Sequence, residues 1–243
     1  YSFFILMAVL SATLLVYLES QKKGLDKETF IDMIFYGLLI GILGARIYYV
    51  IFNLDYYLKD LKEIFFIWHG GLAIHGGLIA TLCFLYFYSK KKSLNLLLIL
   101  DIIVVGLILG QAIGRWGNFF NSEAFGLPTT LPWGLYVKEQ YRPDKYFSYE
   151  YFHPTFLYES FFDLLLFFIL IKLILPKYKT NYGVIAMYYL FFYSIIRFFV
   201  ESLRIDSIKY CFGLPFPQFV SLIIIAVSAL FISYKLKFSS NRN

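Results

Sequence analysis

Hydrophobic residues fall in about seven long blocks along the chain, separated by polar connections. A helix that crosses a hydrocarbon core of about 30 Å needs about 20 apolar residues, and the blocks have about that length. The pattern therefore predicts an all-α integral membrane protein with about seven transmembrane helices. We expect residues 1–243 to form a single membrane domain. The predicted spans are residues 1–18, 30–52, 67–88, 94–114, 155–175, 183–202 and 214–234.

The composition supports the membrane class. Hydrophobic residues make up 60% of the 243 positions and charged residues only 16%, whereas soluble domains average about 45–50% apolar and about 25% charged. The first block has no positively charged region before it and no small-residue cleavage site, so we interpret it as a span and not as a signal peptide. The chain begins with Tyr1 instead of Met, and we expect upstream residues to precede it.

Basic residues are divided unevenly between the two ends of the predicted spans. One side holds many cations but only the acids Glu19, Asp26 and Glu28, whereas the other holds cations and acids in equal number. The positive-inside rule places the basic side in the cytoplasm, so the N-terminus lies outside and the C-terminus inside. Anionic lipid explains the net charge of +6 without a nucleic-acid partner. The cytoplasmic cations are Lys22, Lys23, Lys27, Lys90, Lys91, Lys92, Lys172, Lys177, Lys179, Lys235, Lys237 and Arg242.

The longest connection, residues 115–154, lies on the outer face in this orientation. A loop longer than about 15 residues is usually functional or disordered. This one is rich in aromatic residues, and it contains Trp133 and a Pro-Thr-Thr-Leu-Pro segment. We therefore expect an ordered outer-face loop region, inserted within the membrane domain on the periplasmic or extracellular side.

Two spans carry glycines at the small-xxx-small spacing that lets membrane helices approach closely. We interpret these glycines as helix contacts, with no functional role needed. They are Gly37, Gly41 and Gly44 in the second span and Gly106, Gly110 and Gly114 in the fourth.

Two arginines, Arg46 and Arg197, lie within predicted spans, where an arginine at the bilayer centre costs ~2.5–3.5 kcal/mol on insertion scales. Tyr193, Arg197 and Glu201 recur every four residues, with Arg204 three further on, so they share one face of a helix. One alternative is a purely structural ion pair between Arg197 and Glu201, although the cation precedes the acid, which is the weaker orientation. The other is a polar cavity in the membrane.

Residues 114–126 place four polar side chains where the fourth span must end, namely Arg115, Asn118, Asn121 and Glu123. Gly117 and Asn118 are reasonable helix terminators, but a simple helix end needs only one or two such residues. We therefore favour a polar pocket that opens to a lipid headgroup. Arginine suits phosphate, because its planar guanidinium bonds two oxygens at once.

Histidines open two further spans on the outer side. His75 lies between two Gly-Gly pairs, and a histidine can accept a proton near neutral pH, so we expect His75 to be a base or an orienting group. His69 lies nearer the water, and a structural role is favoured there. His153 precedes Pro154, and it can cap the fifth span.

Glu159, Asp163 and Asp101 also lie in predicted spans. Glu159 lies one turn inside the fifth span, where we expect it to pair with an arginine, and structural and functional interpretations both remain open. Asp163 lies in the same span. Asp101 is far from the outer face, so we interpret it as a hydrogen-bonding group between helices.

The two cysteines show neither a disulfide framework nor a metal-binding spacing with histidine. Cys83 lies within a span and is interpreted as a small apolar side chain, whereas Cys211 lies in the last outer connection. We expect no metal and no dissociable cofactor.

Four polar segments, those that contain His75, Arg115, His153 and Arg197, all lie in the outer half of the membrane under the orientation derived from lysine alone. Residues 114–126 resemble the signature of the phosphatidylglycerol–prolipoprotein diacylglyceryl transferase family, Gly-Arg-x-Gly-Asn-Phe-x-Asn-x-Glu-x-x-Gly, at every fixed position. Residues 44–49 resemble the family's second span, and the resemblance covers essentially the whole chain. Further matches are His75-Gly76-Gly77-Leu78, His153-Pro154-x-x-Leu157-Tyr158-Glu159, Tyr193-x-x-x-Arg197-x-x-x-Glu201-x-x-Arg204 and Gln218.

The resemblance implies an enzyme of the bacterial cytoplasmic (inner) membrane that moves the diacylglyceryl group of phosphatidylglycerol to the lipobox cysteine of prolipoproteins. Its partners would be that lipid, the prolipoprotein signal peptide and membrane lipid, with no nucleic acid. The family's essential arginines fall on Arg115 and Arg197, and its important histidine falls on His75. We expect the headgroup to be bound or supported by Arg115 together with Asn118, Asn121, Glu123, Gly126, Tyr193, Glu201, Arg204 and Tyr1.

Three other classes of function are considered. A transporter would need access from both sides and usually repeated halves, and we see neither. An intramembrane hydrolase would need a Ser/His or paired-Asp arrangement, but Asp101 and Asp163 occur in different contexts. The third is an assembly protein whose polar network is purely structural, and loss of activity without loss of folding would distinguish the enzyme from it.

Overall fold

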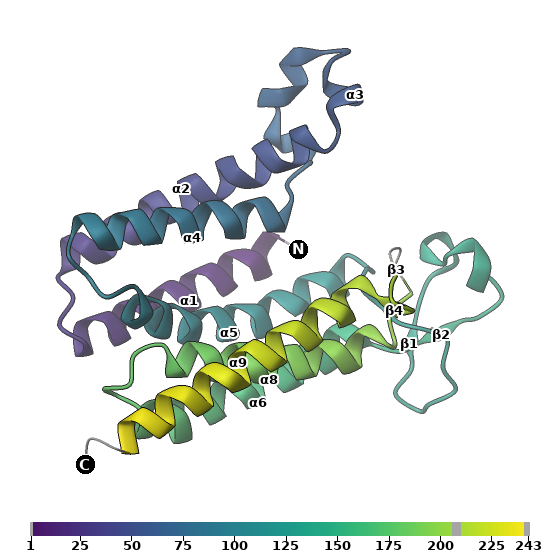
Figure 1. The fold of residues 1–243 in the computed structure, drawn as a ribbon. Helices are drawn as coiled ribbons and strands as arrows, with labels where there is room; N and C mark the ends of the chain where they lie inside the picture. The colour runs from purple at the N-terminus through teal and green to yellow at the C-terminus, as the bar shows by residue number, and fades with distance from the viewer. Residues whose placement is uncertain (1, 206–209, 241–243) are drawn as a thin grey trace. The chain divides into compact units, whose positions relative to one another are not determined.

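The computed structural model describes residues 2–205 and 210–240, and it is mostly helical (Figure 1). The chain forms two compact units, one of Tyr1–Val16 with Leu100–Asn243 and the other of Tyr17–Ile99. The helices are α1 (Ser2–Lys22), α2 (Lys27–Ile51), α3 (Leu54–Tyr57), α4 (Ile74–Lys91), α5 (Leu96–Phe120), α6 (Thr155–Ile169), α7 (Leu175–Lys177), α8 (Val184–Glu201) and α9 (Phe216–Ser240).

Short elements lie in the connections. Four are 3₁₀-helices: η1 (Leu61–Phe65), η2 (Ile67–His69), η3 (Glu139–Tyr141) and η4 (Asp144–Tyr146). A π-helical segment, η5 (Leu170–Ile174), continues α6 just before Pro176, which has no N–H for a helical hydrogen bond. The strands are β1 (Leu135–Tyr136), β2 (Tyr151–Phe152), β3 (Tyr210–Cys211) and β4 (Leu214–Pro215), paired β1–β2 and β3–β4.

Each predicted span corresponds to one of the long helices. Five of the described helices, α1, α2, α5, α8 and α9, are long and apolar enough to cross a membrane. The shorter α4 ends in lysines, and α6 is followed by the π-helical segment and α7. The predicted helical fold is confirmed.

In the unit of residues 17–99, α2 and α4 pack through small residues. A side chain at Gly44 would collide with Ala80 and the backbone of Gly76, and one at Gly41 would approach the hydroxyl of Thr81 to 2.8 Å. Close contact of this kind requires glycine, because it leaves no room for a Cβ atom. The predicted role of the second-span glycines as helix contacts is confirmed for Gly41 and Gly44.

The two helices of this unit begin differently. The carboxylate of Asp26 caps α2 by accepting the backbone N–H and the hydroxyl of Thr29 at 2.7 and 2.6 Å. These hydrogen bonds, with the hydroxyl the stronger influence, lower the pKa of Asp26. The predicted start of the third span at residue 67 is wrong. Gly70 and Gly71 have φ of 89° and 78°, which interrupts the helical backbone, so α4 begins only at Ile74.

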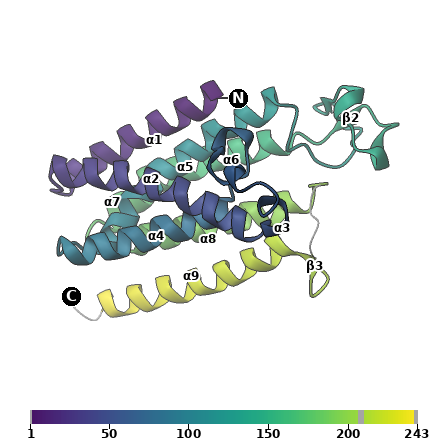
Figure 2. The same cartoon turned by 90° about the horizontal axis from the view of Figure 1, so that it is seen from above.

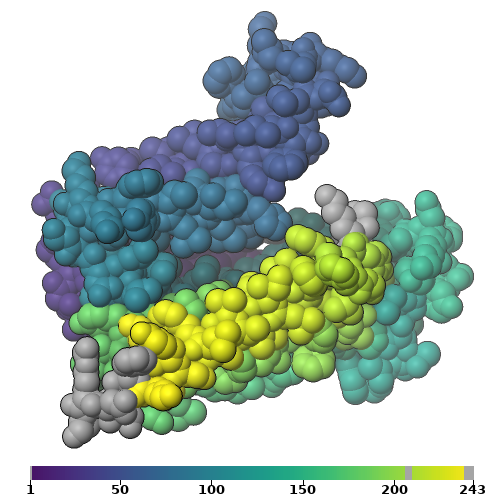
Figure 3. All heavy atoms as spheres, viewed as in Figure 1, coloured from purple at the N-terminus to yellow at the C-terminus, as the bar shows by residue number. Residues whose placement is uncertain are grey.

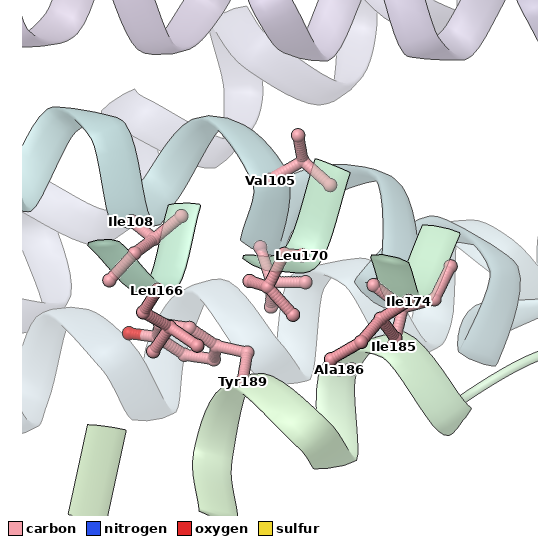
Figure 4. Close-up of a cluster of buried hydrophobic side chains, with 9 residues drawn as sticks. Val105, Ile108, Leu166, Leu170, Ile174, Ile185, Ala186 and Tyr189 are labelled. Carbon is pink, nitrogen blue, oxygen red and sulfur yellow. The ribbon is translucent and has the colours of Figure 1, made fainter. Parts of the chain in front are cut away.

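In the unit of residues 1–16 and 100–243, the core lies between α5, α6, η5 and α8 (Figure 4). Mostly apolar side chains from the four elements meet there. The residues that Figure 4 labels are Val105, Ile108, Leu166, Leu170, Ile174, Ile185, Ala186 and Tyr189.

Asp101 of α5 fixes the start of α8 beside this core. Its carboxylate accepts the backbone N–H groups of Gly183 and Ala186, both at 2.7 Å. These are orphan donors at a helix N-terminus, where a negative charge is also favoured by the helix dipole. The prediction that Asp101 bonds to another helix is confirmed.

The glycines of α5 contact α1 in the same unit. A Cβ atom at Gly106 would collide with the carbonyl oxygen of Ala12, and one at Gly110 would lie 3.3 Å from the Cβ atom of Ala12 and 3.4 Å from the carbonyl oxygen of Ala8. Gly114 is less restricted, because a Cβ atom there would meet neighbours only at 4.0 Å. The predicted close contact is therefore confirmed for Gly106 and Gly110.

The long connection is built around the β1–β2 pair, which lies beyond the ends of α5 and α6 (Figures 1 and 2). Its own small core consists of Phe125, Val137 and Phe152. The prediction that Gly117 and Asn118 end the preceding helix is wrong, since α5 continues to Phe120. Helical hydrogen bonding tolerates both residues, and Arg115 consequently lies within a regular helix.

The last helix, α9, packs against α8 but leaves most of its length on the surface (Figure 3). Only 11% of its most apolar stretch is buried within the protein. Leu222, Val227 and Leu230 are among its exposed apolar side chains. Such a surface suits contact with hydrocarbon instead of water.

Candidate active site

Three helices bring charged side chains together where α5 and α8 end and α6 begins. Arg115 of α5 places Nε 2.6 Å from Glu159 Oε2, and Arg197 of α8 donates from Nη1 to Glu159 Oε1 at 2.5 Å. Arg197 Nη2 also lies 2.6 Å from Glu201 Oε2, and Arg204 Nη1 lies 3.9 Å from Glu159 Oε1. We call these five residues the ion-pair cluster.

Glu159 is the centre of the ion-pair cluster, because it pairs with arginines from two different helices. The sequence leaves its role open between structure and function, and it predicts only an arginine partner, which is confirmed. The structural alternative for Arg197, an intrahelical pair with Glu201, is also present. It describes only part of the contacts, since Arg197 pairs with Glu159 of α6 as well.

The acids of the ion-pair cluster are buried and the arginines are partly open. Glu159 and Glu201 are each 3% exposed, whereas the side chains of Arg115 and Arg197 are each 22% exposed. Among the residues that the structure describes, none pairs with Nη1 or Nη2 of Arg115. Arg115 is therefore held by Nε alone, and the two nitrogens that suit a phosphate remain available.

Hydrogen bonds hold α5 and α6 in the register that joins Arg115 to Glu159. Trp116 Nε1 donates to the hydroxyl of Ser160 at 3.1 Å, and that hydroxyl donates to the carbonyl of Ala112 at 2.8 Å. Trp116 and Ser160 immediately follow the two charged residues in the sequence. The same contacts therefore fix the relative positions of the ion pair.

A second set of polar residues lies one to two helical turns away from the ion-pair cluster, further into α5, α6 and α8. Tyr189 donates to Gln111 Oε1 at 2.9 Å and stacks on Tyr193 with ring centroids 5.6 Å apart. Asp163 is fully buried. We call Gln111, Asp163, Tyr189 and Tyr193 the inner polar layer. Of these, the sequence singles out only Tyr193 as a site residue.

The signature residues that follow Arg115 have two kinds of surroundings: Asn118, Asn121 and Glu123 lie at the end of α5, whereas Gly126 lies beside the ion-pair cluster. Asn118 donates to Glu123 Oε1 at 3.0 Å, while Glu123 and Asn121 are exposed. The chain reverses here through Ser122 and Ala124, which have φ of 53° and 56°. These residues lie where the chain leaves α5. Among the described contacts, none of them pairs with the ion-pair cluster.

Gly126 has a packing role beside the ion-pair cluster. It forms a β-bridge with Arg204, and its N–H donates to the carbonyl of His153 at 2.7 Å. A Cβ atom there would lie 2.5 Å from the carbonyl oxygen of Leu203 and 2.7 Å from Thr155. Only glycine therefore allows the outer connection to lie against the ends of α6 and α8.

Arg46, in the unit of residues 17–99, is saturated by backbone carbonyls. It is 5% exposed and donates to the carbonyl oxygens of Glu63, Ile64, Phe66, Gly70 and Gly71 at 2.5–3.4 Å. Its guanidinium also lies 5.1 Å from the ring centroid of Tyr57. These hydrogen bonds satisfy the donors of the Arg46 guanidinium. Arg46 therefore has a structural role, which is to hold the connection between α2 and α4 in place.

The three histidines have different surroundings. His75 is exposed in the first turn of α4, and its ring lies 6.3 Å from that of Tyr48. His69 Nδ1 lies 3.0 Å from Glu63 Oε2, which agrees with the structural role favoured for it. His153 does not cap α6 as predicted, because Pro154 occupies that position. Its Nδ1 lies 3.2 Å from the hydroxyl of Tyr158.

His75 belongs to the unit of residues 17–99 and is described with that unit alone. Tyr1 lies outside the described residues. Gln111 and Asp163 have a signal in the sequence that reasoning about single motifs misses. Gln111 and Asp163 each lie four residues from a member of the ion-pair cluster on the same helix, and so on its face.

Comparison with known proteins decides the family. The model of the prolipoprotein diacylglyceryl transferase family matches residues 1–234. The chain belongs to this family. It is 49% identical over 210 residues to the phosphatidylglycerol–prolipoprotein diacylglyceryl transferase of Thermotoga maritima, covering 86% of this chain and 71% of that protein.

Two other relatives extend the match. The protein of the same name from Fervidobacterium nodosum is 44% identical over 235 residues, covering 96% of this chain and 80% of that protein. The one from Lactobacillus acidophilus is 40% identical over 240 residues, covering 98% of this chain and 85% of that protein. Membership identifies the chain as a membrane transferase of lipoprotein biosynthesis.

Proposed function

We propose that this chain transfers the diacylglyceryl group of phosphatidylglycerol to the thiol of the lipobox cysteine of prolipoproteins. The products are a thioether and glycerol phosphate, and the reaction is the first step of bacterial lipoprotein maturation. The relatives are named for this donor lipid and for the prolipoprotein acceptor. The observation that supports our assignment of the site is the geometry of Arg115, whose Nε is held by buried Glu159 while its two terminal nitrogens stay available.

The two arginines act on the phosphate of the donor. A thiolate attacks the primary carbon of the diacylglyceryl group, and the phosphate departs with the electrons of the broken C–O bond. Arg115 and Arg197 stabilise the charge that develops on the departing oxygen. Glu159 and Glu201 hold the guanidinium groups in place beforehand, so little reorganisation is needed at the moment of reaction.

The substrate thiol must lose its proton before it attacks, since the thiolate is the nucleophile and an ordinary cysteine has a pKa of about 8.5. We assign the proton to His75, whose imidazole can accept it near neutral pH. Glu123 or Glu201 orients the base or the arginines. No step requires a metal, and the chain's own cysteines are not used.

The proposed topology has seven spans, with the N-terminus outside and the C-terminus in the cytoplasm. This topology is supported by the excess of basic residues at one end of the predicted spans. It is also supported by the helix that corresponds to each span. Residues 115–154 then lie on the outer face of the bacterial cytoplasmic membrane as part of one membrane domain. Both substrates are embedded in lipid, so the site opens sideways to the bilayer. Nucleic acid takes no part.

The test is transfer by purified protein from phosphatidylglycerol to a lipobox peptide, measured as release of glycerol phosphate. We expect Arg115→Ala to abolish transfer, since loss of one such donor costs about 10²–10³ in rate. Arg115→Lys should also be poor, because a point charge cannot bond two oxygens together. Lys145→Ala, which removes an exposed cation of the outer region, should retain activity. Full transfer by Arg115→Ala would refute the phosphate role.

A further inference from the structure

The connection between α2 and α4, residues 52–73, exposes many large apolar side chains. Leu58, Phe65 and Trp68 are 68%, 75% and 72% exposed. Within residues 52–73, all of which the structure describes, only Tyr57 is buried. We call this segment the outer arm, because it lies on the outer face in the proposed topology. A large exposed apolar surface usually marks an interaction site. The other exposed apolar side chains of the outer arm are Phe52, Leu54, Tyr56, Leu61, Ile67 and Leu72.

The outer arm is a folded segment but not a membrane span. Its helical elements α3, η1 and η2 have at most five residues, so its backbone groups could not all be satisfied within hydrocarbon. Arg46 holds the arm through five backbone carbonyls, and its guanidinium lies over the ring of buried Tyr57. The exposed apolar side chains therefore belong to a fixed scaffold. Charged side chains are interspersed among them, namely Asp55, Lys59, Asp60, Lys62 and Glu63.

The apolar surface of the outer arm continues that of the two helices beside it. Ile47 and Ile51 of α2 are exposed and lie four residues apart, as do Ile74 and Leu78 of α4, so each pair lies on one face of its helix. Only 17% of the most apolar stretch of α2 is buried within the protein. In Figure 1 the outer arm turns away from the end of α2 and runs across the axis of α2 and α4. Since both helices are predicted spans, a segment with this direction runs parallel to the membrane surface.

From this geometry we propose that the outer arm is an interfacial anchor, which lies on the outer leaflet with its apolar side chains among the headgroups and the adjoining acyl chains. The partner of its exposed surface is the bilayer itself. Segments of this kind bury their apolar side about 5–10 Å into the boundary between headgroups and acyl chains, and tryptophan and tyrosine favour that depth. The interspersed charged side chains stay among the headgroups.

The outer arm also sets the depth of the proposed base. His75 is the second residue of α4, and α4 begins directly after the arm. An anchored arm therefore holds His75 near the level of the headgroups, where the phosphate ester of the donor lies. This second part of the inference rests on the proposed function, which assigns the thiol proton to His75, whereas the anchoring does not depend on it.

The anchoring is tested with spin labels on the full chain in vesicles that contain phosphatidylglycerol. The parent protein is Cys83→Ala/Cys211→Ala, and single labels are attached at Leu58→Cys and at Phe65→Cys. Collisions of each label with oxygen, which dissolves in the bilayer, are compared with collisions with a water-soluble nickel chelate. Two labels on α4 give the reference values, namely Leu82→Cys in its exposed apolar part and Lys91→Cys at its exposed basic end.

We expect the ratio of oxygen to nickel collisions at both arm positions to be several-fold above that of Lys91→Cys and to approach that of Leu82→Cys. Ratios equal to that of Lys91→Cys would place the arm in water. Exclusion of both reagents would show that protein covers the arm. Either result overturns the proposal.

The role of the arm in placing His75 is tested by releasing the arm from the bilayer. Phe65→Glu/Trp68→Glu should make the label at Leu58→Cys accessible to nickel, because a charge is costly below the headgroups, and should lower transfer several-fold near neutral pH. The loss should shrink above about pH 8.5, where the substrate thiol ionises without a base. The matched Phe65→Leu/Trp68→Leu should keep both quantities near those of the parent.

Full transfer with a released arm, or a loss that persists at high pH, would overturn the placing of His75 by the arm. Arg115→Ala tests the proposed function separately. Its labels should keep the values of the parent, and full transfer by this variant would refute the phosphate site whatever the position of the arm.

Discussion

Arg46 and Arg115 show that two arginines near helix ends can have opposite roles. The guanidinium of Arg46 donates to five carbonyl oxygens of one connection, so nothing remains for a ligand. Arg115 has one charged partner, Glu159, at Nε. The difference lies in the partners, because carbonyl groups can surround a whole guanidinium while a single carboxylate covers one edge of it. The role of an arginine is therefore shown less by its residue type than by the number of hydrogen bonds that it makes within the protein.

At the residue scale, we predict that Arg46→Met destabilises the connection between α2 and α4. Each buried carbonyl that loses its donor costs about 1–3 kcal/mol, so the free energy of unfolding should fall by at least that amount. Limited proteolysis within residues 58–71 should become faster than in the wild type. The conservative Arg46→Lys should recover only part of the loss, since an ammonium group cannot reach all these carbonyls. Unchanged proteolysis of Arg46→Met would contradict the structural role.

At the element scale, the contact between α2 and α4 depends on how close their backbones lie. A side chain at Gly44 would collide with Ala80 and Gly76, whereas a Cβ atom at Gly37 would meet Phe84 at an ordinary 3.8 Å. The two glycines belong to the same helix and differ only in how near the partner helix comes. They therefore offer a matched pair of variants.

We predict that Gly44→Val lowers stability by about 1–3 kcal/mol, the usual cost of overpacking, and lowers transfer as well. A side chain at position 44 would collide with Gly76, which directly follows His75 in α4. The collision should therefore displace the histidine together with the helix. Gly37→Ala should leave both quantities near wild type. Thermal unfolding in detergent and glycerol phosphate release would measure them, and equal stability of the two variants would contradict the close contact.

At the scale of the whole molecule, the proposed reaction takes its nucleophile from the substrate and not from the enzyme. Cys83 is exposed on α4 and Cys211 lies in the β3–β4 pair, and both are free thiols. Neither belongs to the ion-pair cluster or the inner polar layer. An enzyme that formed a covalent intermediate on its own thiol would need Cys83 or Cys211 near the phosphate site.

We predict that the double variant Cys83→Ala/Cys211→Ala keeps transfer within about twofold of the wild type, because substitutions away from packed or catalytic features usually change free energies by about 0.5 kcal/mol or less. The measurement is again glycerol phosphate release with a lipobox peptide. Loss of activity with unchanged folding would favour an enzyme-bound intermediate instead of direct attack by the substrate.

The sequence alone determined the class of the protein, its helices and the family motif. Apolar blocks reveal spans because a helix must satisfy its backbone within itself in lipid, and Arg115, Arg197 and Glu201 stand out because charge is costly there. Helix ends were less well predicted, as at Gly117 and Ile74, since hydrogen bonding at an end depends on neighbouring segments.

Only the tertiary structure decided which polar groups meet. Glu159 joins arginines of α5 and α8, Arg46 is saturated by carbonyls, and Asp163 is left without a donor. Periodicity places a residue on one face of its own helix, but it does not say which face of another helix lies opposite. That depends on how the helices rotate and slide when their small residues pack, and this is why the centre of the ion-pair cluster could not be read from its motif.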